Sequence, residues 1–209
     1  MGIFKNGILS AFSGKMGTVV GYELNGQAIG RSLPRPRTKK ASPMELANRK
    51  KFGDVQLWLK PLTPFLRIGF KNYDPKFQGF VAAKSYNSKN AVTGQYPDFI
   101  VDPGLALVSF GHLSQATSAT AVSDAASTIS FNWSGGDLQR REKAMILLYD
   151  IENKKALSDT SATWRTTGKF DWVLDPSFSG RSFHCYLAFV MEDQTDQSIS
   201  QYLGEITVM

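Results

Sequence analysis

The feature that most constrains the fold is a series of short alternating segments in the second half of the chain. From about Phe99 onward, turn residues separate stretches with apolar side chains at every second position, as in Ile129, Phe131 and Trp133. Period two places successive side chains on opposite faces of a strand, so one face can be buried. Short strands at this spacing, without helices between them, predict an antiparallel β-sandwich of the immunoglobulin or fibronectin type III kind.

Nine segments carry this pattern in the second half of the chain. The expected strands cover residues 99–102, 105–110, 119–123, 128–133, 144–152, 154–158, 169–174, 182–192 and 200–208. About 100 residues is the usual size of such a sandwich. We therefore expect an α+β protein with two domains, a basic hairpin–strap–helix module at 1–98 and the sandwich at 99–209.

The first domain is expected to open with a β-hairpin. Asn25-Gly26 is typical of a two-residue type I′ turn, because both central positions need a positive φ. This turn pairs Leu24 with Gln27 and leaves Gly21 and Gly30 on a face almost without side chains. Two interpretations stay open: that face lets another backbone approach closely, or it belongs to a strongly twisted ribbon facing solvent.

A basic, proline-containing segment follows the hairpin. Pro34 and Pro36 favour extended backbone and remove hydrogen-bond donors, which predicts an exposed strap. The candidate partner-binding residues of the hairpin, the strap and the next helix are Gly21, Gly30, Arg31, Arg35, Arg37, Lys39, Lys40, Arg49, Lys50 and Lys51. The strap could bind nucleic-acid phosphates, or it could dock on the acidic surface of another copy.

The strap runs into a helix start. Ser42, Pro43 and Glu45 form a capping box with proline at the first helical position, and the helix is expected to end near Lys60. Its apolar positions at helical spacing are Met44, Ala47, Phe52, Val55, Leu59 and Leu62. A short turn after Pro64 and a further helix capped by Asp74 are expected next. That further helix should carry Phe77, Phe80, Val81 and Tyr86 on one side.

Charge is divided unevenly between the two halves. Residues 1–100 hold 16 basic and 5 acidic residues, a net charge of +11, whereas residues 101–209 hold 8 and 13, a net charge of −5. Such asymmetry suggests two domains with different partners, or two faces that attract each other between copies.

The chain offers no pattern typical of an enzyme or a metal site. His184 and Cys185 are neighbours in an expected strand, so their side chains point to opposite faces and cannot form a catalytic pair. His112 has no acidic residue at a ligand-like spacing, and "FSGKMG" lacks the first glycine of a phosphate loop. The acidic loop at 192–198 is expected to be a solvated hairpin loop. We predict no enzyme activity, no cofactor and no metal.

Several ordered blocks resemble one protein family. They are "GKMGTVVGYELNGQAIGRSLP", the following "K-x5-E-x3-RKKF", then "SYNSKNAVTGQYPDF" and the C-terminal "YLAFV" and "SQYLGEITV". Together they are similar to an uncharacterised family of about 210-residue Bacteroidota proteins, a domain of unknown function. The resemblance implies a hairpin-and-helix front half and a sandwich-like back half. It implies no activity. One departure lies in the capped helix, where the family pattern is "E-x-Q-L-A-x-R" and this chain has "MELANR", with Met44 and Glu45.

These observations favour a non-enzymatic structural or interaction protein that self-associates, for example as a subunit of a larger particle or filament. The alternative is a nucleic-acid-binding protein that uses the strap as a phosphate clamp. A carbohydrate-binding sandwich with exposed Trp133, Trp164 or Trp172 is a third hypothesis. With no secretory signal and no apolar stretch of membrane-spanning length, we expect a cytoplasmic protein, a homo-oligomer without membrane or small-molecule partners.

Overall fold

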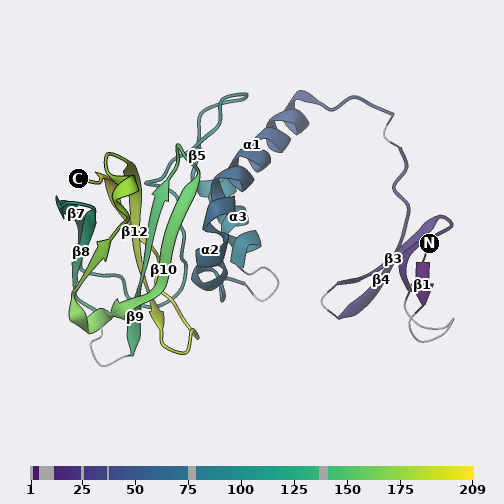
Figure 1. Ribbon diagram of the computed structural model, residues 1–209. Coiled ribbons are helices and arrows are strands. Elements are labelled where there is room, and N and C mark those ends of the chain that lie inside the picture. The colour runs from purple at the N-terminus through teal and green to yellow at the C-terminus, as the bar shows by residue number, and fades with distance from the viewer. Residues whose placement is uncertain (1, 5–11, 25, 37, 75–78, 137–140) are drawn as a thin grey trace. The chain divides into compact units, whose positions relative to one another are not determined.

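The computed structural model describes residues 2–4, 12–24, 26–36, 38–74, 79–136 and 141–209 (Figure 1). The chain divides into two compact units, Met1–Ser42 and Pro43–Met209. The boundary expected between residues 98 and 99 falls inside the second unit, where helices and sheet share one core. The two units are therefore described separately.

The first unit is an antiparallel sheet with strand order β1-β2-β3-β4. Its strands are β1 Gly2–Phe4, β2 Phe12–Met16, β3 Val19–Leu24 and β4 Gln27–Ser32. The expected hairpin register is confirmed, since Leu24 pairs with Gln27 and Gly21 with Gly30. Asn25 lies outside the described residues, and Gly26 has the positive φ of 77° that the turn requires.

Helices open the second unit. They are α1 Pro43–Leu59, the 3₁₀ turn η1 Lys60–Leu62, α2 Thr63–Gly69 and α3 Gly79–Asn90. α1 ends two residues before Pro61, as the sequence predicts. Pro75 and Phe77, expected in the first turn of the last helix, lie outside the described residues.

Two antiparallel sheets follow, with strand orders β10-β9-β12-β13 and β11-β8-β7. Their strands are β7 Ser118–Ala125, β8 Thr128–Ser134, β9 Glu142–Asp150, β10 Lys155–Trp164, β11 Lys169–Val173, β12 Ser182–Met191 and β13 Gln201–Thr207. Short 3₁₀ turns lie at η2 Arg165–Thr167 and η3 Pro176–Phe178. A small hairpin, β5 Val92–Thr93 with β6 Ile100–Val101, joins α3 to the sheets.

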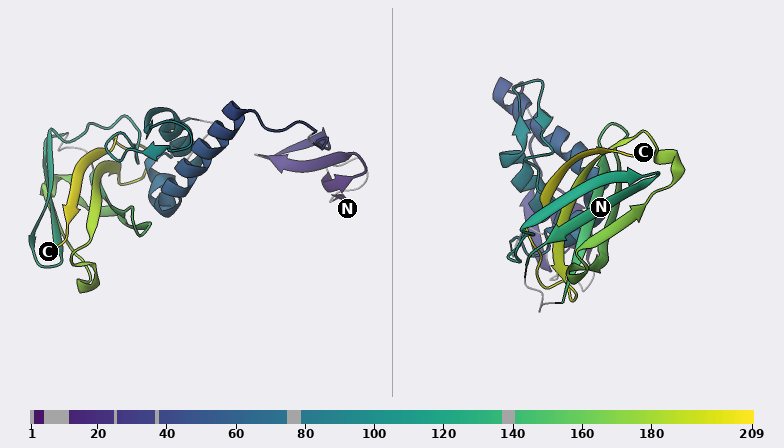
Figure 2. Two further views of the ribbon diagram at one scale, coloured as in Figure 1. Left: turned by 90° about the horizontal axis from the view of Figure 1, so that it is seen from above. Right: turned by 90° about the vertical axis from the view of Figure 1, so that its left-hand side faces the viewer.

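The second unit has three layers (Figure 2). The sheet containing β9 and β12 lies in the middle, with the helices on one face and the three-stranded sheet on the other. Met145 and Tyr186 face the helical core, whereas Ile146 and Cys185 face the core between the sheets. Because side chains alternate along a strand, both faces of β9 and β12 are buried, which explains their continuous apolar sequences.

The segment 105–110, expected as a strand, is irregular. Along this segment, side chains make the hydrogen bonds that the backbone of a neighbouring strand would make in a sheet. Buried Asn87 of α3 accepts a hydrogen bond from the Leu107 N–H (2.9 Å) and donates one to the Leu107 carbonyl (2.8 Å). The Val108 N–H donates to Ser200 Oγ (3.0 Å). Since these groups satisfy the buried backbone, the segment needs no neighbouring strand.

The first three turns of α1 differ from the expected core helix. Val55 and Leu59 are fully buried, but Met44 is 76% exposed and Phe52 57% exposed. Only the C-terminal half of the helix lies on the sheet, where Tyr149 Oη donates to the Trp58 carbonyl (2.9 Å). None of the described helices is both long enough and apolar enough to cross a lipid bilayer.

Candidate functional site

The observed units divide the charge differently from the two halves of the sequence. Residues 1–42 contain seven basic residues and one acidic residue, Glu23, a net charge of +6. Residues 43–209 contain 17 basic and 17 acidic residues and are neutral overall. The whole net charge of the protein therefore resides in the small N-terminal unit.

The strap is extended and exposed. The Leu33 N–H donates to the Thr18 carbonyl (2.8 Å) at the end of the sheet, and the backbone from there to Pro36 has no regular structure. Arg35, Lys39 and Lys40 are exposed, whereas Arg37 lies outside the described residues. The guanidinium of Arg31 lies 5.5 Å from the centre of the Tyr22 ring.

The basic residues of α1 are arranged differently from those of the strap. Arg49 pairs with Glu45 (2.6 Å) and Lys50 pairs with Asp54 (2.7 Å), each one helical turn away. Lys51 lies on the same helix and is half-buried. The ten candidate residues thus fall into two groups: the sheet and strap of the first unit, and an α1 surface whose charge is partly neutralised.

The two glycines of the hairpin have different surroundings. A Cβ at Gly21 would overlap the Phe12 carbonyl oxygen, so β2 of the same sheet already occupies that space. A Cβ at Gly30, on the outer strand β4, would meet no atom within 4 Å. Only the surface at Gly30 is open to another chain.

The N-terminal sheet has almost no core of its own. Within residues 12–24, 26–36 and 38–42, Gly21 is the only buried residue. Met16, Val19 and Leu24 are 43%, 40% and 53% exposed. The sheet therefore presents apolar side chains that nothing in the described part of this unit covers.

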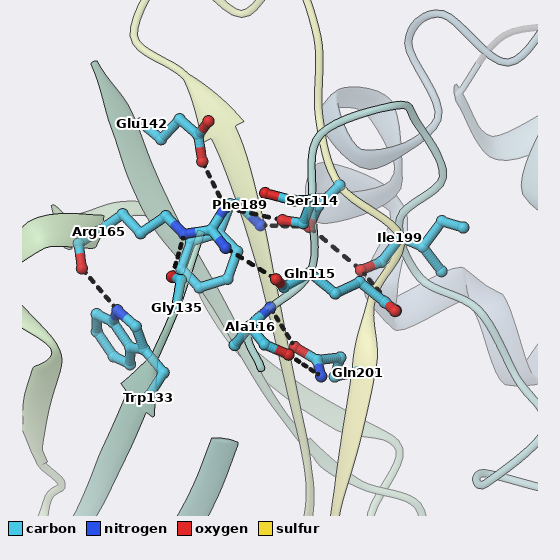
Figure 3. A network of polar contacts seen from close by, with 11 residues as sticks. Ser114, Gln115, Ala116, Trp133, Gly135, Glu142, Arg165, Phe189, Ile199 and Gln201 are labelled. Atoms are coloured by element: carbon cyan, nitrogen blue, oxygen red, sulfur yellow. Dashed lines mark hydrogen bonds and ion pairs between the residues drawn. The ribbon is translucent and has the colours of Figure 1, made fainter. Parts of the chain in front are cut away.

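The most buried polar cluster is an ion pair inside the second unit (Figure 3). Arg165 Nη1 lies 2.5 Å from Glu142 Oε2, and the side chains of both residues are 1% exposed. The guanidinium also donates to the carbonyls of Ser114 (2.8 Å), Gln115 (2.9 Å) and Gly135 (3.2 Å). It also lies 3.9 Å from the centre of the Phe189 ring.

This cluster is structural. Four contacts of the guanidinium go to Glu142 and to the three backbone carbonyls, and the side chains of both ion-pair partners are almost completely buried. It fixes the loop before β7, which Gln201 holds as well through paired hydrogen bonds with Ala116 (3.0 Å each). Trp133 Nε1 donates to the Arg165 carbonyl (2.8 Å), so the indole is a core residue.

The contacts of His184 and Cys185 are those of residues that pack within the fold. His184 Nδ1 lies 2.8 Å from Tyr202 Oη, and burial lowers the pKa of the imidazole although Glu205 and Asp150 favour its charged form. Cys185 is completely buried between the sheets, which raises the pKa of its thiol to about 12. Across the described residues, no three His, Cys, Asp or Glu side chains gather closely enough to hold a metal.

A groove between α1 and α3 was not predicted from the sequence. It has a volume of about 470 Å³ and is lined by Phe52, Phe80, Val81, Lys84, Ser85, Ser88 and Lys89. The helical pattern assigned Phe52 and Val81 to the core, yet they are 57% and 56% exposed. The groove is formed by two helices together, so the pattern of apolar residues within one helix does not reveal it.

The family model for a family of unknown function, DUF6266, matches residues 11–204. The chain belongs to this family. No curated protein and no solved structure matches the chain.

The DUF6266 match runs from just before β2 into β13. It therefore includes both the strap and the three-layered unit, and they belong to one family pattern. The expected resemblance to an uncharacterised family is confirmed, whereas the Bacteroidota affiliation stays a prediction.

Proposed function

We propose that this DUF6266 protein is a non-enzymatic structural or interaction protein that self-associates through its N-terminal unit, as a subunit of a larger particle or filament would. The observation that supports this proposal is the sheet of residues 1–42, in which Gly21 is the only buried residue within 12–24, 26–36 and 38–42 and the apolar side chains of those ranges are half-buried or exposed. Sheets of three or more strands become stable when a hydrophobic face is covered. Another polypeptide can provide that cover.

The residues of this unit cannot stabilise it by a disulfide or by a bound metal ion. At 42 residues it is near the size at which domains need disulfides, metals or oligomerisation. The only cysteine, Cys185, lies elsewhere, so no intrachain disulfide can form. Residues 1–42 contain no histidine, and Glu23 is their only acidic residue, so they lack the ligands for a metal. Burial against protein is the remaining route.

We also propose that the two sheets of the second unit form an immunoglobulin-like sandwich of the fibronectin type III kind. In chain order from β7 to β13, the first, second and fifth strands form one sheet and the other four form the facing sheet. Sandwiches of this kind commonly serve as binding or spacer modules, which agrees with a structural role by analogy of fold alone.

The proposal is tested by the solution mass of the full chain, measured by light scattering at low and high salt. A mass well above 23.1 kDa is expected at micromolar concentration. A monomer at high micromolar concentration under both conditions would refute self-association.

A pair of variants at Gly30 tests whether the edge of β4 takes part. Leu24 and Gln27 flank the two-residue turn, so hydrogen-bonded and non-bonded pairs alternate, and the Gly30 N–H points outward from the edge. Gly30→Pro removes that donor, and proline is tolerated on edge strands. Gly30→Ala is the matched control because it keeps the donor. If the edge pairs with another chain, the solution mass of the assembly should fall for the proline variant and stay unchanged for the alanine variant.

The second candidate function is nucleic-acid binding. The observation that favours it is the net charge of +6 on a small unit with an exposed, extended strap. Phosphate contacts make affinity fall steeply with salt. Replacing Arg35, Arg37, Lys39 and Lys40 by Gln should flatten the salt dependence of binding to a duplex oligonucleotide. Equal binding by wild type and variant at every salt concentration would remove this candidate.

A further inference from the structure

The groove between α1 and α3 combines apolar walls with uncompensated positive charge. Lys84 and Lys89 line it, and no acidic side chain is among its described lining residues. The Lys84 ammonium lies 3.1 Å from the centre of the Phe52 ring and 2.5 Å from Gln56 Oε1. Lys84 is only 8% exposed, and this burial lowers the pKa of its ammonium. Ser88 Oγ is buried without a hydrogen-bond partner.

This surface fits an apolar group that carries negative charge. A carboxylate near Lys84 and Lys89 would supply the counter-charge that the groove lacks, and aromatic or aliphatic side chains would cover Phe52 and Val81. A basic segment such as the strap is disfavoured, because like charges brought together at an interface lower the affinity.

The hairpin of β5 and β6 has the opposite character. Its tip is exposed from Thr93 to Asp98 and projects above β5 in Figure 1. Tyr96 is 51% exposed, and the centre of its ring lies 6.5 Å from the centre of the Phe99 ring. Asp98 is the charged residue of the tip, and the sequence contains no lysine or arginine between Lys89 and Arg140. The tip is thus apolar and acidic where the groove is apolar and basic.

In addition to the contact through the N-terminal unit proposed above, we propose that the hairpin tip of one copy docks in the α1–α3 groove of another copy. Within one chain, the groove is not lined by any described residue of the tip. Phe99 and Val101, at its base, line a separate cleft with Asp54 and Trp58 of α1, whereas the groove lies beside Phe52. Tip and groove are different surfaces, so the contact is head-to-tail and generates rings or open filaments.

Disulfide trapping between two full-length variants tests this contact. One variant carries Val81→Cys in the groove and the other Tyr96→Cys at the tip, and the two are mixed under mild oxidation. The native Cys185 is fully buried with a pKa of about 12, so it does not react. The control replaces the tip variant by Val173→Cys, at an apolar position on β11 that is 74% exposed.

We expect a disulfide-linked dimer from the Val81→Cys and Tyr96→Cys mixture at a rate at least ~10-fold above the control mixture, because docking raises the effective thiol concentration. Equal rates in the two mixtures would overturn the inference. Equally fast linking of Val81→Cys to itself would also overturn it, since that result indicates a two-fold contact. The mass of the wild-type chain separates these failures from a failure of self-association itself.

Discussion

Replacing Glu142 by Gln removes the negative charge of the buried ion pair and preserves the shape of the side chain. Arg165 would then keep its full charge in a site where its side chain is 1% exposed. Because the guanidinium cannot be deprotonated in a protein, the molecule has no way to neutralise the remaining charge. The substitution therefore measures what the counter-charge contributes.

The size of the effect follows from the surroundings of Arg165. Removing one partner of a buried ion pair costs about 3–5 kcal/mol. The carbonyls of Ser114, Gln115 and Gly135 still accept hydrogen bonds from the guanidinium, and they disperse part of its charge. We therefore expect the lower end, about 3 kcal/mol, or roughly a hundredfold in the folding equilibrium.

The assay is urea unfolding followed by tryptophan fluorescence. All four tryptophans lie between residues 43 and 209, so the signal reports on the second unit. With a slope of about 2 kcal/mol/M, the midpoint should fall by ~1.5 M urea. Glu192→Gln is the matched control. Its pair with Arg141 (3.1 Å) is exposed, so its loss should cost less than about 1 kcal/mol. Equal midpoints for the two variants would refute the reasoning.

Three further substitutions test the packing of the second unit by urea unfolding. Asn87→Leu should lower the free energy of unfolding by about 2–4 kcal/mol, because the N–H and C=O of Leu107 lose their buried partner; a loss below 1 kcal/mol would contradict this role. Tyr149→Phe should cost about 1 kcal/mol through the lost hydrogen bond to the Trp58 carbonyl, and an unchanged midpoint would show that water replaces it. Burial lowers the pKa of His184, so the unfolded state binds its proton first, and the free energy of unfolding should fall as pH drops below about 6.5. His184→Gln should reduce that dependence, and an identical pH profile would assign it to other groups.

The strands of the second unit were largely predictable because their signals are local. Alternation in residues 128–133 and the turn residues around each segment place six of the seven strands from β7 to β13 within two positions of the observed bounds, whereas β10 continues six residues beyond the expected end at Ser158. The hairpin register followed from the Asn25-Gly26 turn in the same way. Neither inference needed knowledge of what the strands pack against.

Features that depend on distant parts of the chain were not predictable. Periodicity placed Phe52 and Val55 on one helical face, but it could not show that α1 extends past its support, leaving Phe52 exposed and Val55 buried. The irregular path of 105–110 depends on Asn87 and Ser200, which lie about 20 and 92 residues away from their backbone partners. The α1–α3 groove likewise arises only from two helices together.

The central position of β9 and β12 has a consequence for synthesis of the protein on the ribosome. The helices of residues 43–90 emerge first, but the strand β12 that buries part of their apolar face is made about 100 residues later. At roughly 5–20 residues per second, those helices wait about 5–20 s for the part of their support that β12 supplies. During that interval the nascent chain exposes part of the apolar surface that later forms its core.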